Sequence, residues 1–466
     1  MDLKKILKQK IISEVISPST EWPVLIYDRT CAEILKNLFT KSEFITYNIV
    51  MSLYLEEDRE QANFPVIYFV KCTKEISKII NSDYLNKKYT SFTVCTLVPP
   101  EDLNHDITFK IVHMSLKALE ERVFITDITN INSVCNILNA YFYLEYTSKD
   151  LEKYSNILDD ESKSRSGKLI LFDRSIDLYT PILHFFTFQP LLEEINITDM
   201  SKIYEEYGDT ALWKEVRHTH LGDMSDLLKS YVRKVKTQPS DNIKDLMKAV
   251  MDAPETLKTN KGLRLFFDLT KECYKKFDYI NEFSNIEQKI VTKEKLKSKD
   301  VIKALTERKI DLYDKKRIAL LYKLSGHEYT ERELAKLDEN LKNFILENKT
   351  NANDKFKPIS YEYKYEYEVS KYEPTISVVL REYIKNNKQL IPFYKVEREK
   401  NTINSLRRTN LISVKKDINK NNICCIYIKG GVTYEEIKCI YKLTDELGIE
   451  FLIGSDSIIK SDLYIK

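Results

Sequence analysis

Strand-like apolar runs alternate with helix-like segments in the first part of the chain, and this alternation constrains the fold more than any other feature. Segments such as 31–39 and 107–121 place apolar residues three and four apart, which predicts helices. Strands that alternate with helices indicate a parallel sheet, so we assign residues 1–127 to a first α/β domain. The expected strands of this domain are 23–28, 64–72, 89–98 and 122–127.

A second sheet is predicted from two distant parts of the chain. Residues 168–177 begin with a continuous apolar strand, KLILFD. Residues 422–455 read as strand, Gly-Gly turn, amphipathic helix and second strand, which is a βαβ unit of ordinary length. Two strands alone are unstable, so we expect this βαβ unit to complete the sheet begun near residue 168. We assign residues 128–210 and 421–466 to a second α/β domain.

The segment between these two parts reads as a mainly helical insertion, 211–420. From about 211 to 350 it is rich in Lys, Glu and Leu and poor in Gly and Pro. Pro254 lies inside one helical stretch, where the missing amide and the ring should end the helix near Ala253. We therefore predict a helical hairpin over 243–277, with its tip at 258–261. The Tyr-rich stretch 361–373 alternates with period two and is expected to be a solvent-facing strand or loop.

Composition limits the class of function. The 73 Lys and Arg residues nearly balance the 71 Asp and Glu residues, so no overall field draws the chain to nucleic acid or to an anionic membrane. No run reaches the roughly 18 apolar residues of a membrane span, and the N-terminus lacks the apolar core of a signal peptide. We expect a cytoplasmic protein. Its eight cysteines include no CxxC pair, which favours buried, reduced thiols.

Five segments, in order, resemble the Sec/Munc (SM) family of syntaxin-binding vesicle-fusion proteins. The first is LILFDRSIDLYTPILHFFTFQPLL, with its Asp-Arg-x-x-Asp, and the second, ALWKEVRHTHLGDMSDLL, is similar to the family's exocytic, plasma-membrane branch. The others are 243–277, YDKKRIALLYKL and IYIKGGVTYEEIKCIYKL…FLIGSDSII. The chain departs from the family in a compressed stretch between 325 and 420, and the family's Tyr-Pro-Tyr-Ile-like segment is only faintly echoed by LIPFY.

The resemblance implies an arch of three domains: the two parallel-sheet α/β domains and the large, mainly helical insertion. It also implies a non-enzymatic SNARE chaperone that holds a syntaxin in a central cleft and promotes SNARE assembly for vesicle docking and fusion, with exocytosis as the expected step. The implied partners are a syntaxin-like SNARE and the assembled SNARE complex. We expect a monomer without cofactors that reaches the plasma membrane indirectly, through SNAREs. The alternatives are an SM-like factor of endosomal, vacuolar or ER–Golgi trafficking and an α/β transferase.

The resemblance also carries candidate partner-binding residues onto this chain. Matching through KALEERVFITD places the pocket for a syntaxin N-terminal peptide on Leu116, Leu119 and Glu121. In the family the hairpin over 243–277 is a switch, which makes Pro254 a candidate hinge. Charged residues are expected to line the central cleft, and each of them also has a plain interpretation as solvated surface. They are Asp28, Arg29, Lys36, Lys41, Arg59 and Glu60.

Three constellations suggest chemistry, and each has a structural alternative that we favour. Asp173, Arg174 and Asp177 at a strand end could form a catalytic cluster, but no nucleophile or second acid–base group has a recognisable spacing to them. A buried ion-pair network that fixes the following turn is the better interpretation. Gly430-Gly431 could cradle phosphate, yet no GxGxxG or GxxxxGK[ST] is present. We expect a tight turn with Thr433 capping the helix ahead of Glu436.

His218 and His220 are the third constellation. Two residues apart on a helix, they point about 200° apart and cannot form an i, i+4 metal pair. We expect no metal there, and one ring packed against Trp213 or a neighbouring strand.

Overall fold

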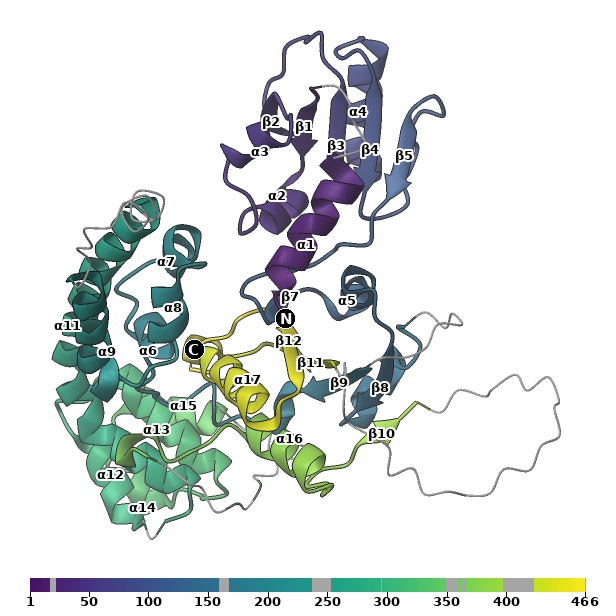
Figure 1. The fold of residues 1–466 in the computed structure, drawn as a ribbon. Helices are drawn as coiled ribbons and strands as arrows, with labels where there is room; N and C mark the ends of the chain where they lie inside the picture. The colour runs from purple at the N-terminus through teal and green to yellow at the C-terminus, as the bar shows by residue number, and fades with distance from the viewer. Residues whose placement is uncertain are drawn as a thin grey trace, which may run out of the picture. The chain divides into compact units, whose positions relative to one another are not determined.

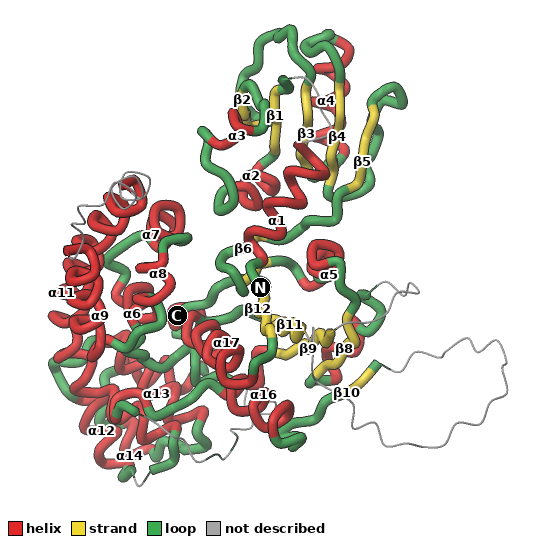
Figure 2. Tube along the Cα trace, in the orientation of Figure 1, coloured by secondary structure: helices red, strands yellow, loops and turns green. Residues whose placement is uncertain are grey.

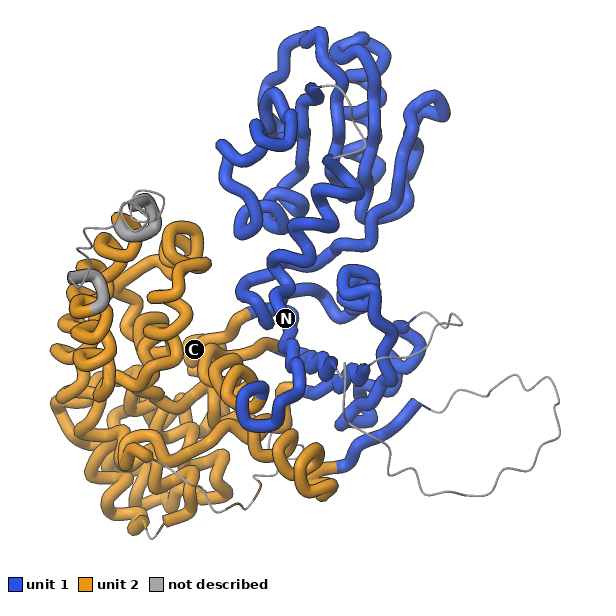
Figure 3. Tube along the Cα trace, in the orientation of Figure 1, with its two compact units in different colours: residues 1–173, 392–430, 444–457 blue, residues 174–391, 431–443, 458–466 orange. Residues whose placement is uncertain are grey.

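The computed structural model describes residues 1–16, 22–158, 167–236, 253–294, 296–348, 359, 361, 366–396 and 423–465. The chain forms two compact units (Figure 3). Unit 1 comprises 1–173, 392–430 and 444–457, and unit 2 comprises 174–391, 431–443 and 458–466. The chain therefore passes between the units five times, and neither unit is one continuous stretch of sequence.

The first sheet of unit 1 is five-stranded and fully parallel, as the alternating pattern predicts (Figure 1). Its order is β2-β1-β3-β4-β5. The strands are β1 (Val24–Tyr27), β2 (Met51–Tyr54), β3 (Val66–Val70), β4 (Phe92–Thr96) and β5 (Thr108–Ile111). Alternate strand residues enter two separate cores. Leu25, Ile67 and Cys95 pack with α1 (Leu3–Ile11) and α2 (Arg29–Leu35), whereas the opposite face packs on α4 (Lys74–Leu85).

The second sheet of unit 1 has the order β10-β8-β9-β11-β12-β7-β6. These strands are β6 (Lys117–Ala118), β7 (Val123–Ile125), β8 (Phe142–Tyr146), β9 (Gly167–Asp173), β10 (Tyr394–Lys395), β11 (Ile423–Lys429) and β12 (Glu450–Ser455). β11 pairs in parallel with β9 along its full length, from Ile423 opposite Gly167 to Lys429 opposite Asp173. The prediction that the C-terminal βαβ unit completes this sheet is confirmed. Its helix is α17 (Tyr434–Leu447).

The fourth strand expected in the first sheet belongs to the second sheet. β7, within the predicted run 122–127, pairs in parallel with β12 and places Phe124 opposite Gly454. A Cβ atom at residue 454 would lie 2.0 Å from the Phe124 ring, so glycine is what allows the ring to lie over β12. The absence of a side chain at Gly454 thus leaves the space that the Phe124 ring of β7 occupies.

The predicted helix over 107–121 is wrong. Residues 108–111 form β5 and residues 117–118 form β6, with extended chain between them. The apolar residues follow period two rather than 3.6: Val112, Met114, Leu116 and Ala118 are all at most 2% exposed, and polar residues separate them. This alternation is typical of extended chain and was present in the sequence.

Unit 2 is mainly helical, as predicted for the insertion (Figure 2). The longest helix, α11 (Ala253–Val291), runs beside α9 (Leu221–Lys236), and the hydroxyl of Tyr274 donates to the carbonyl of Leu221 at 2.7 Å. The other helices are α6 (Phe188–Ile195), α7 (Met200–Tyr207), α8 (Ala211–Val216), α12 (Ser298–Thr306), α13 (Leu312–Leu324), α14 (Glu331–Leu334), α15 (Glu339–Glu347) and α16 (Thr375–Lys385).

Pro254 is the second described residue of α11, and residues 237–252 lie outside the described residues, so the expected end of a helix near Ala253 stays a prediction. The predicted hairpin tip at 258–261 is wrong, since these residues lie inside α11. Residues 243–252, the other arm of the predicted hairpin, lie outside the described residues.

Further expectations concern the cysteines, membrane-spanning helices and the Tyr-rich stretch. All eight cysteines are buried, which confirms the predicted burial of their thiols. Among the described residues, no helix combines the length and the apolar character needed to cross a membrane. Of the Tyr-rich stretch, residues 362–365 lie outside the described residues, and residues 368–370 form a 3-10 turn rather than a strand.

Candidate functional site

Asp173 of the Asp-Arg-x-x-Asp motif ends β9, and Arg174 and Asp177 form a buried network in unit 2. Arg174 donates from both terminal nitrogens to Glu436 at the start of α17, at 2.6 and 2.8 Å. The two side chains are 8% and 0% exposed. Arg174 also donates to the carbonyl oxygens of Gly431 and Asp177, at 3.3 and 2.7 Å. A bidentate pair with such contacts fixes the turn after the strand, which confirms the structural interpretation.

Asp177 is fully buried, and its hydrogen bonds stabilise a turn rather than bind a substrate. Its Oδ1 accepts from the amides of Tyr179 and Thr180, both at 2.9 Å. Its Oδ2 accepts from the hydroxyl of Thr180 at 2.6 Å and from the amide of Thr375, at the start of α16, at 2.8 Å. Asp177 therefore ties the turn after β9 to a helix about 200 residues further along the chain.

Gly430-Gly431 forms the tight turn that we expected. Both residues have positive φ, 101° and 108°, and a Cβ on Gly431 would lie 2.1 Å from the Ile459 side chain. Thr433 and Glu436 then bond reciprocally: the Thr433 hydroxyl accepts from the Glu436 amide at 3.2 Å, and Glu436 accepts from the Thr433 amide at 2.9 Å. This capping box begins α17, so the predicted cap is confirmed.

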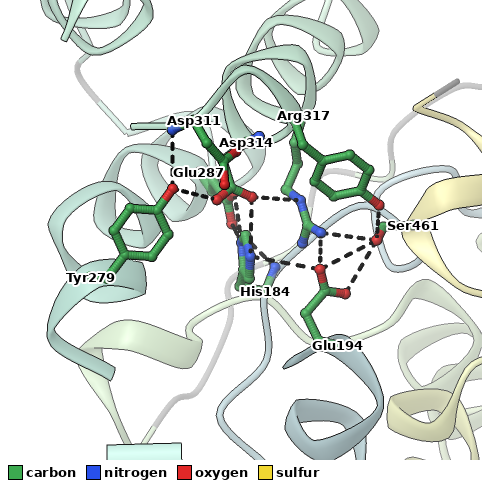
Figure 4. A network of polar contacts seen from close by, with 9 residues as sticks. His184, Glu194, Tyr279, Glu287, Asp311, Asp314, Arg317 and Ser461 are labelled. Carbon is green, nitrogen blue, oxygen red and sulfur yellow. Dashed lines mark hydrogen bonds and ion pairs between the residues drawn. The ribbon is translucent and has the colours of Figure 1, made fainter. Parts of the chain in front are cut away.

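A second buried polar network, which we did not predict, joins α6, α11 and α13 in unit 2 (Figure 4). His184 is 3% exposed, and its Nδ1 lies 2.9 Å from Glu287 of α11. Its Nε2 faces Asp314 of α13 at 3.6 Å. Arg317 is fully buried and pairs with Glu194 of α6. The sequence signal is a histidine inside the apolar run ILHFFTF, but its partners Glu287 and Asp314 lie more than 100 residues away.

Two carboxyl groups of this network have pKa values that are shifted in opposite directions. Burial alone would raise the pKa of Glu194, but Arg317 and His184 outweigh it and lower the pKa. Burial dominates at Asp314 and raises the pKa of that carboxyl despite His184 and Arg317 nearby. Asp314 also accepts from the Tyr279 hydroxyl at 2.9 Å. Contacts from three helices and from Ser461 hold these groups in place, so this network supports the fold of unit 2.

Two of the predicted cleft residues have buried side chains in unit 1: Asp28 follows β1, and Arg59 lies between β2 and β3. Asp28 is 5% exposed and caps α2 by accepting from the Cys31 amide at 2.9 Å. Its other oxygen accepts from the Lys71 amide at 3.1 Å. The side chain of Arg59 is 5% exposed and pairs with Asp83 at 2.7 Å. Neither side chain presents an open charge to a partner.

The other four cleft residues are exposed and belong to unit 1. Arg29 begins α2, its side chain is 88% exposed, and its Nε lies 3.7 Å from Glu56. Lys36 follows α2 directly, and Lys41 and Glu60 lie in loops. These residues form the part of the predicted surface that is open to binding.

The three predicted peptide-pocket residues are mostly covered. Leu116 is 2% exposed and belongs to the main core of unit 1, and Leu119 is 9% exposed. Glu121 is partly buried. Leu116 and Leu119 therefore offer little exposed apolar surface to a peptide.

His218 and His220 contact different tyrosines. His220 stacks on Tyr367 with ring centres 3.6 Å apart, and burial, followed by Lys438, lowers its pKa to about 4. His218 tilts against Tyr441. Trp213 stacks on Phe266 of α11, and the expected packing of one histidine ring against Trp213 or a neighbouring strand stays a prediction. Among the described residues, no cluster of His, Cys, Asp or Glu has the arrangement of a metal site.

One fully parallel sheet and one mixed, mainly parallel sheet in a single unit, with a helical unit inserted between β9 and β10, define the fold class of this protein. A model of the Sec1 family matches residues 23–466. The chain belongs to the Sec1 family, the family of SM proteins. These are non-enzymatic SNARE chaperones, so membership confirms that the chain is not an enzyme and contradicts the transferase alternative.

Relatives from several branches of the family are similar to this chain. The protein transport protein sec1 of Schizosaccharomyces pombe is 22% identical, over 98% of this chain and 83% of the relative. The vacuolar protein sorting-associated protein 45 of Saccharomyces cerevisiae is 22% identical, over 64% of this chain and 60% of the relative. The SEC1 family transport protein SLY1 of Encephalitozoon cuniculi is 19% identical, over 100% and 98%.

Solved structures share the fold. The Unc18–syntaxin 1 complex from Monosiga brevicollis contains a chain that is 18% identical, with a TM-score of 0.78 over 100% of this chain and 98% of that one. The SM protein Vps45 in complex with the Qa SNARE Tlg2 is 14% identical, with a TM-score of 0.76 over 100% and 97%. The predicted fold class of two parallel-sheet regions with a helical insertion is thus confirmed.

Proposed function

We propose that this chain is an SM-type chaperone that binds a syntaxin-like SNARE and promotes SNARE assembly for vesicle docking and fusion. The observation that carries the proposal is the Sec1 family match over residues 23–466. The similar structures include SM proteins solved with syntaxin 1 and with the Qa SNARE Tlg2. Association with membranes is then peripheral and occurs through the SNARE.

The exposed charges of unit 1 are the proposed contact surface. Arg29, Lys36 and Lys41 lie on or close after α2, and Glu60 adds one opposite charge. Scattered polar contacts of this kind set specificity and association rate more than affinity. The surface around Glu121 remains our proposed place for a SNARE N-terminal peptide, with its apolar contacts supplied by neighbours other than the buried Leu116.

We further propose that the trafficking step is exocytosis at the plasma membrane. The support is the segment Leu212-Trp213 followed by Arg217-His218-x-His220-Leu221, which resembles the exocytic branch. Two relatives named sec1 match almost all of this chain. Relatives named for vacuolar sorting and SLY1 also match, so an endosomal, vacuolar or ER–Golgi step is the alternative.

A binding panel tests both proposals. The purified chain is titrated by calorimetry against the cytosolic regions of Qa SNAREs from the plasma membrane, endosome and Golgi of its own organism. We expect the plasma-membrane SNARE to bind at least tenfold more tightly than the others. Tightest binding of an endosomal or Golgi SNARE would reassign the step, and no binding to any of them would refute the chaperone.

A charge-reversal variant tests the contact surface. Arg29→Glu, Lys36→Glu and Lys41→Glu together should weaken SNARE binding at least tenfold and leave the melting temperature unchanged, because all three side chains are exposed. The matched control reverses three exposed lysines of unit 2, Lys299, Lys303 and Lys336. Equal affinity of both variants would show that the surface lies elsewhere.

Pro254 stays our proposed hinge for the start of α11. Pro254→Ala restores an amide and raises helix propensity at this position, so helical conformations that extend past Ala253 become more populated. We expect tighter binding of a vesicle SNARE and faster reconstituted fusion, with syntaxin affinity unchanged. Pro190→Ala, in the first turns of α6, is the matched control. A fusion rate equal to that of the unmodified chain would make Pro254 a fixed helix start.

A further inference from the structure

The loop between β2 and β3, residues 55–65, begins with two residues whose side chains are buried among exposed carboxylates. The sequence of this part is LEEDRE. Leu55 is 3% exposed, and the side chain of Arg59 is 5% exposed. The acidic residues around them are all exposed, and they are Glu56, Glu57, Asp58 and Glu60. The loop is therefore anchored at two positions and open to solvent at the others.

Arg59 joins this loop to the last turns of α4. Its Nη1 lies 2.7 Å from Oδ2 of Asp83, whose side chain is 4% exposed. Asp83 also accepts from the hydroxyl of Tyr68 at 2.8 Å and pairs with Nζ of Lys88 at 3.1 Å. A buried ion pair with further hydrogen bonds is costly to break, because the remaining charge loses a partner. The pair of Arg59 and Asp83 thus fixes the backbone of the loop at residue 59.

Two further contacts hold the loop just after Arg59. The side-chain amide of Gln61 donates to the carbonyl oxygen of Lys87 at 3.2 Å. The amide of Ala62 donates to the carbonyl oxygen of Lys88 at 2.8 Å. Both acceptors follow α4 directly. Arg59 is therefore the charged member of a set of contacts that attaches this loop to the end of α4.

The same loop adjoins the proposed contact surface of unit 1. Glu60, which belongs to that surface, follows Arg59 directly. Glu56 lies three residues before Arg59, and its Oε1 is 3.7 Å from Nε of Arg29, another member of the surface. The positions of both exposed glutamates thus depend on the backbone that Arg59 holds.

We propose that Arg59 is a positioning residue for SNARE binding, which acts through Glu56 and Glu60 without contacting the SNARE itself. This inference rests on the proposed function and adds to it a residue with an indirect role. Without the contact to Asp83 the loop has more conformations, and binding then costs more free energy because the loop must be ordered. The buried charge of Arg59 therefore supports affinity by holding the loop in place.

The first test measures affinity for the SNARE that binds most tightly in the binding panel, by calorimetry on the full chain. Arg59→Met removes the charge, and we expect about tenfold weaker binding because the loop loses its anchor. Arg59→Lys can still pair with Asp83 and should bind nearly as tightly as the unmodified chain. Lys168→Met is the matched control with unchanged affinity, since it removes the cationic partner of Glu145, a buried carboxylate outside the loop.

The outcomes of this test separate the inference from the proposed function. Equal affinity of Arg59→Met and the unmodified chain would overturn the inference alone. No SNARE binding by the unmodified chain would overturn the proposed function and the inference with it. Weakening by Arg59→Lys as large as that by Arg59→Met would also overturn the inference, because the pair with Asp83 would then not be what matters.

A double-mutant cycle distinguishes positioning from direct contact and from a general loss of stability. In a chain with Glu56→Gln and Glu60→Gln, Arg59→Met should have no further effect on affinity, because the groups that it positions have lost their charge. The same factor of weakening in both backgrounds would overturn the proposal. If Arg59→Met does not fold, Gln61→Ala replaces it in the cycle, since that side chain is exposed and its loss removes only one contact of the loop. We expect the same pattern with a smaller effect.

Discussion

Asp177 can be buried in the interior of unit 2 because its two oxygens accept hydrogen bonds from four donors. A buried carboxylate is costly unless hydrogen bonds replace its lost hydration. The same condition is met at Glu436, which receives both terminal nitrogens of Arg174 together with the Thr433 amide. At this scale, charged residues that look catalytic in the sequence are held in structural roles by their full set of partners.

Asp177→Ala should lower the free energy of unfolding by about 3 kcal/mol, because it leaves several buried donors without an acceptor. Urea unfolding followed by tryptophan fluorescence measures the change, since Trp213 is buried in the same unit. Asp226→Ala is the control: that side chain is 87% exposed and should change stability by less than about 0.5 kcal/mol. A similar small loss for both variants would contradict the role assigned to Asp177.

The lowered pKa of Glu194 predicts a pH dependence. A carboxylate whose pKa is lower in the folded state stabilises the fold above its unfolded pKa, roughly 4.3 for glutamate, and this stabilisation is lost as pH falls through the folded value. Asp314, with its raised pKa, acts in the opposite direction. Glu194→Gln should therefore lose less stability than the unmodified chain between pH 6 and pH 3.5, measured by urea unfolding. An equal loss of stability in both proteins would show that the pKa of Glu194 does not change on unfolding.

At the scale of elements, strands with continuous apolar sequence could be predicted well, whereas their neighbours in a sheet could be predicted only in part. Runs such as 64–72 contain their strands, and the pairing of β11 with β9 followed from the need of a βαβ unit for further strands. β7 was placed in the wrong sheet because its pairing depends on Gly454, more than 300 residues away. The residues Val112 to Ala118 did carry a period-two signal, which a helical interpretation overlooked.

In the candidate site, too, only interactions between residues close in the sequence could be predicted. The capping box of Thr433 and Glu436 was predictable because its members are three residues apart. Burial of Asp28 and Arg59 was not, since it depends on Lys71 and Asp83 from other elements. Local spacing therefore predicts local roles, whereas exposure depends on packing that the sequence does not show.

Gly454→Ala tests how β12 and β7 fit together. The added Cβ would lie 2.0 Å from the Phe124 ring, so the strands must shift, and we expect a loss of about 2 kcal/mol in unfolding free energy. Phe124→Leu in the same chain should recover part of that loss, because the smaller side chain leaves room for the methyl group. Additive losses in the double variant would mean that the two residues do not collide.

At the scale of the whole molecule, the five passages of the chain between units make each unit depend on distant segments. The chain of 431–466 supplies β12, which joins β11 to β7 in the second sheet. It also supplies Glu436 and Ser461, which complete the two buried networks of unit 2. Both units therefore need this segment.

A fragment of residues 1–430 should consequently lack a cooperative unfolding transition, which near-ultraviolet circular dichroism and urea unfolding can measure. Adding a synthetic peptide of residues 431–466 should restore part of the transition, since the missing strand and buried partners return. The same peptide with Glu436→Ala is the control and should restore less. A fragment that unfolds cooperatively by itself would show that neither unit relies on the segment.

The pairing of β9 with β11 also has a consequence for biosynthesis. About 250 residues separate the end of β9 from the start of β11. At a translation rate of roughly 5–20 residues per second, β9 emerges from the ribosome roughly 12–50 s before its neighbour. Throughout that interval the apolar residues Leu169 to Phe172 have an unpaired edge, which is a template for aggregation. The nascent chain should therefore depend on ribosome-associated chaperones until its last strands have been made.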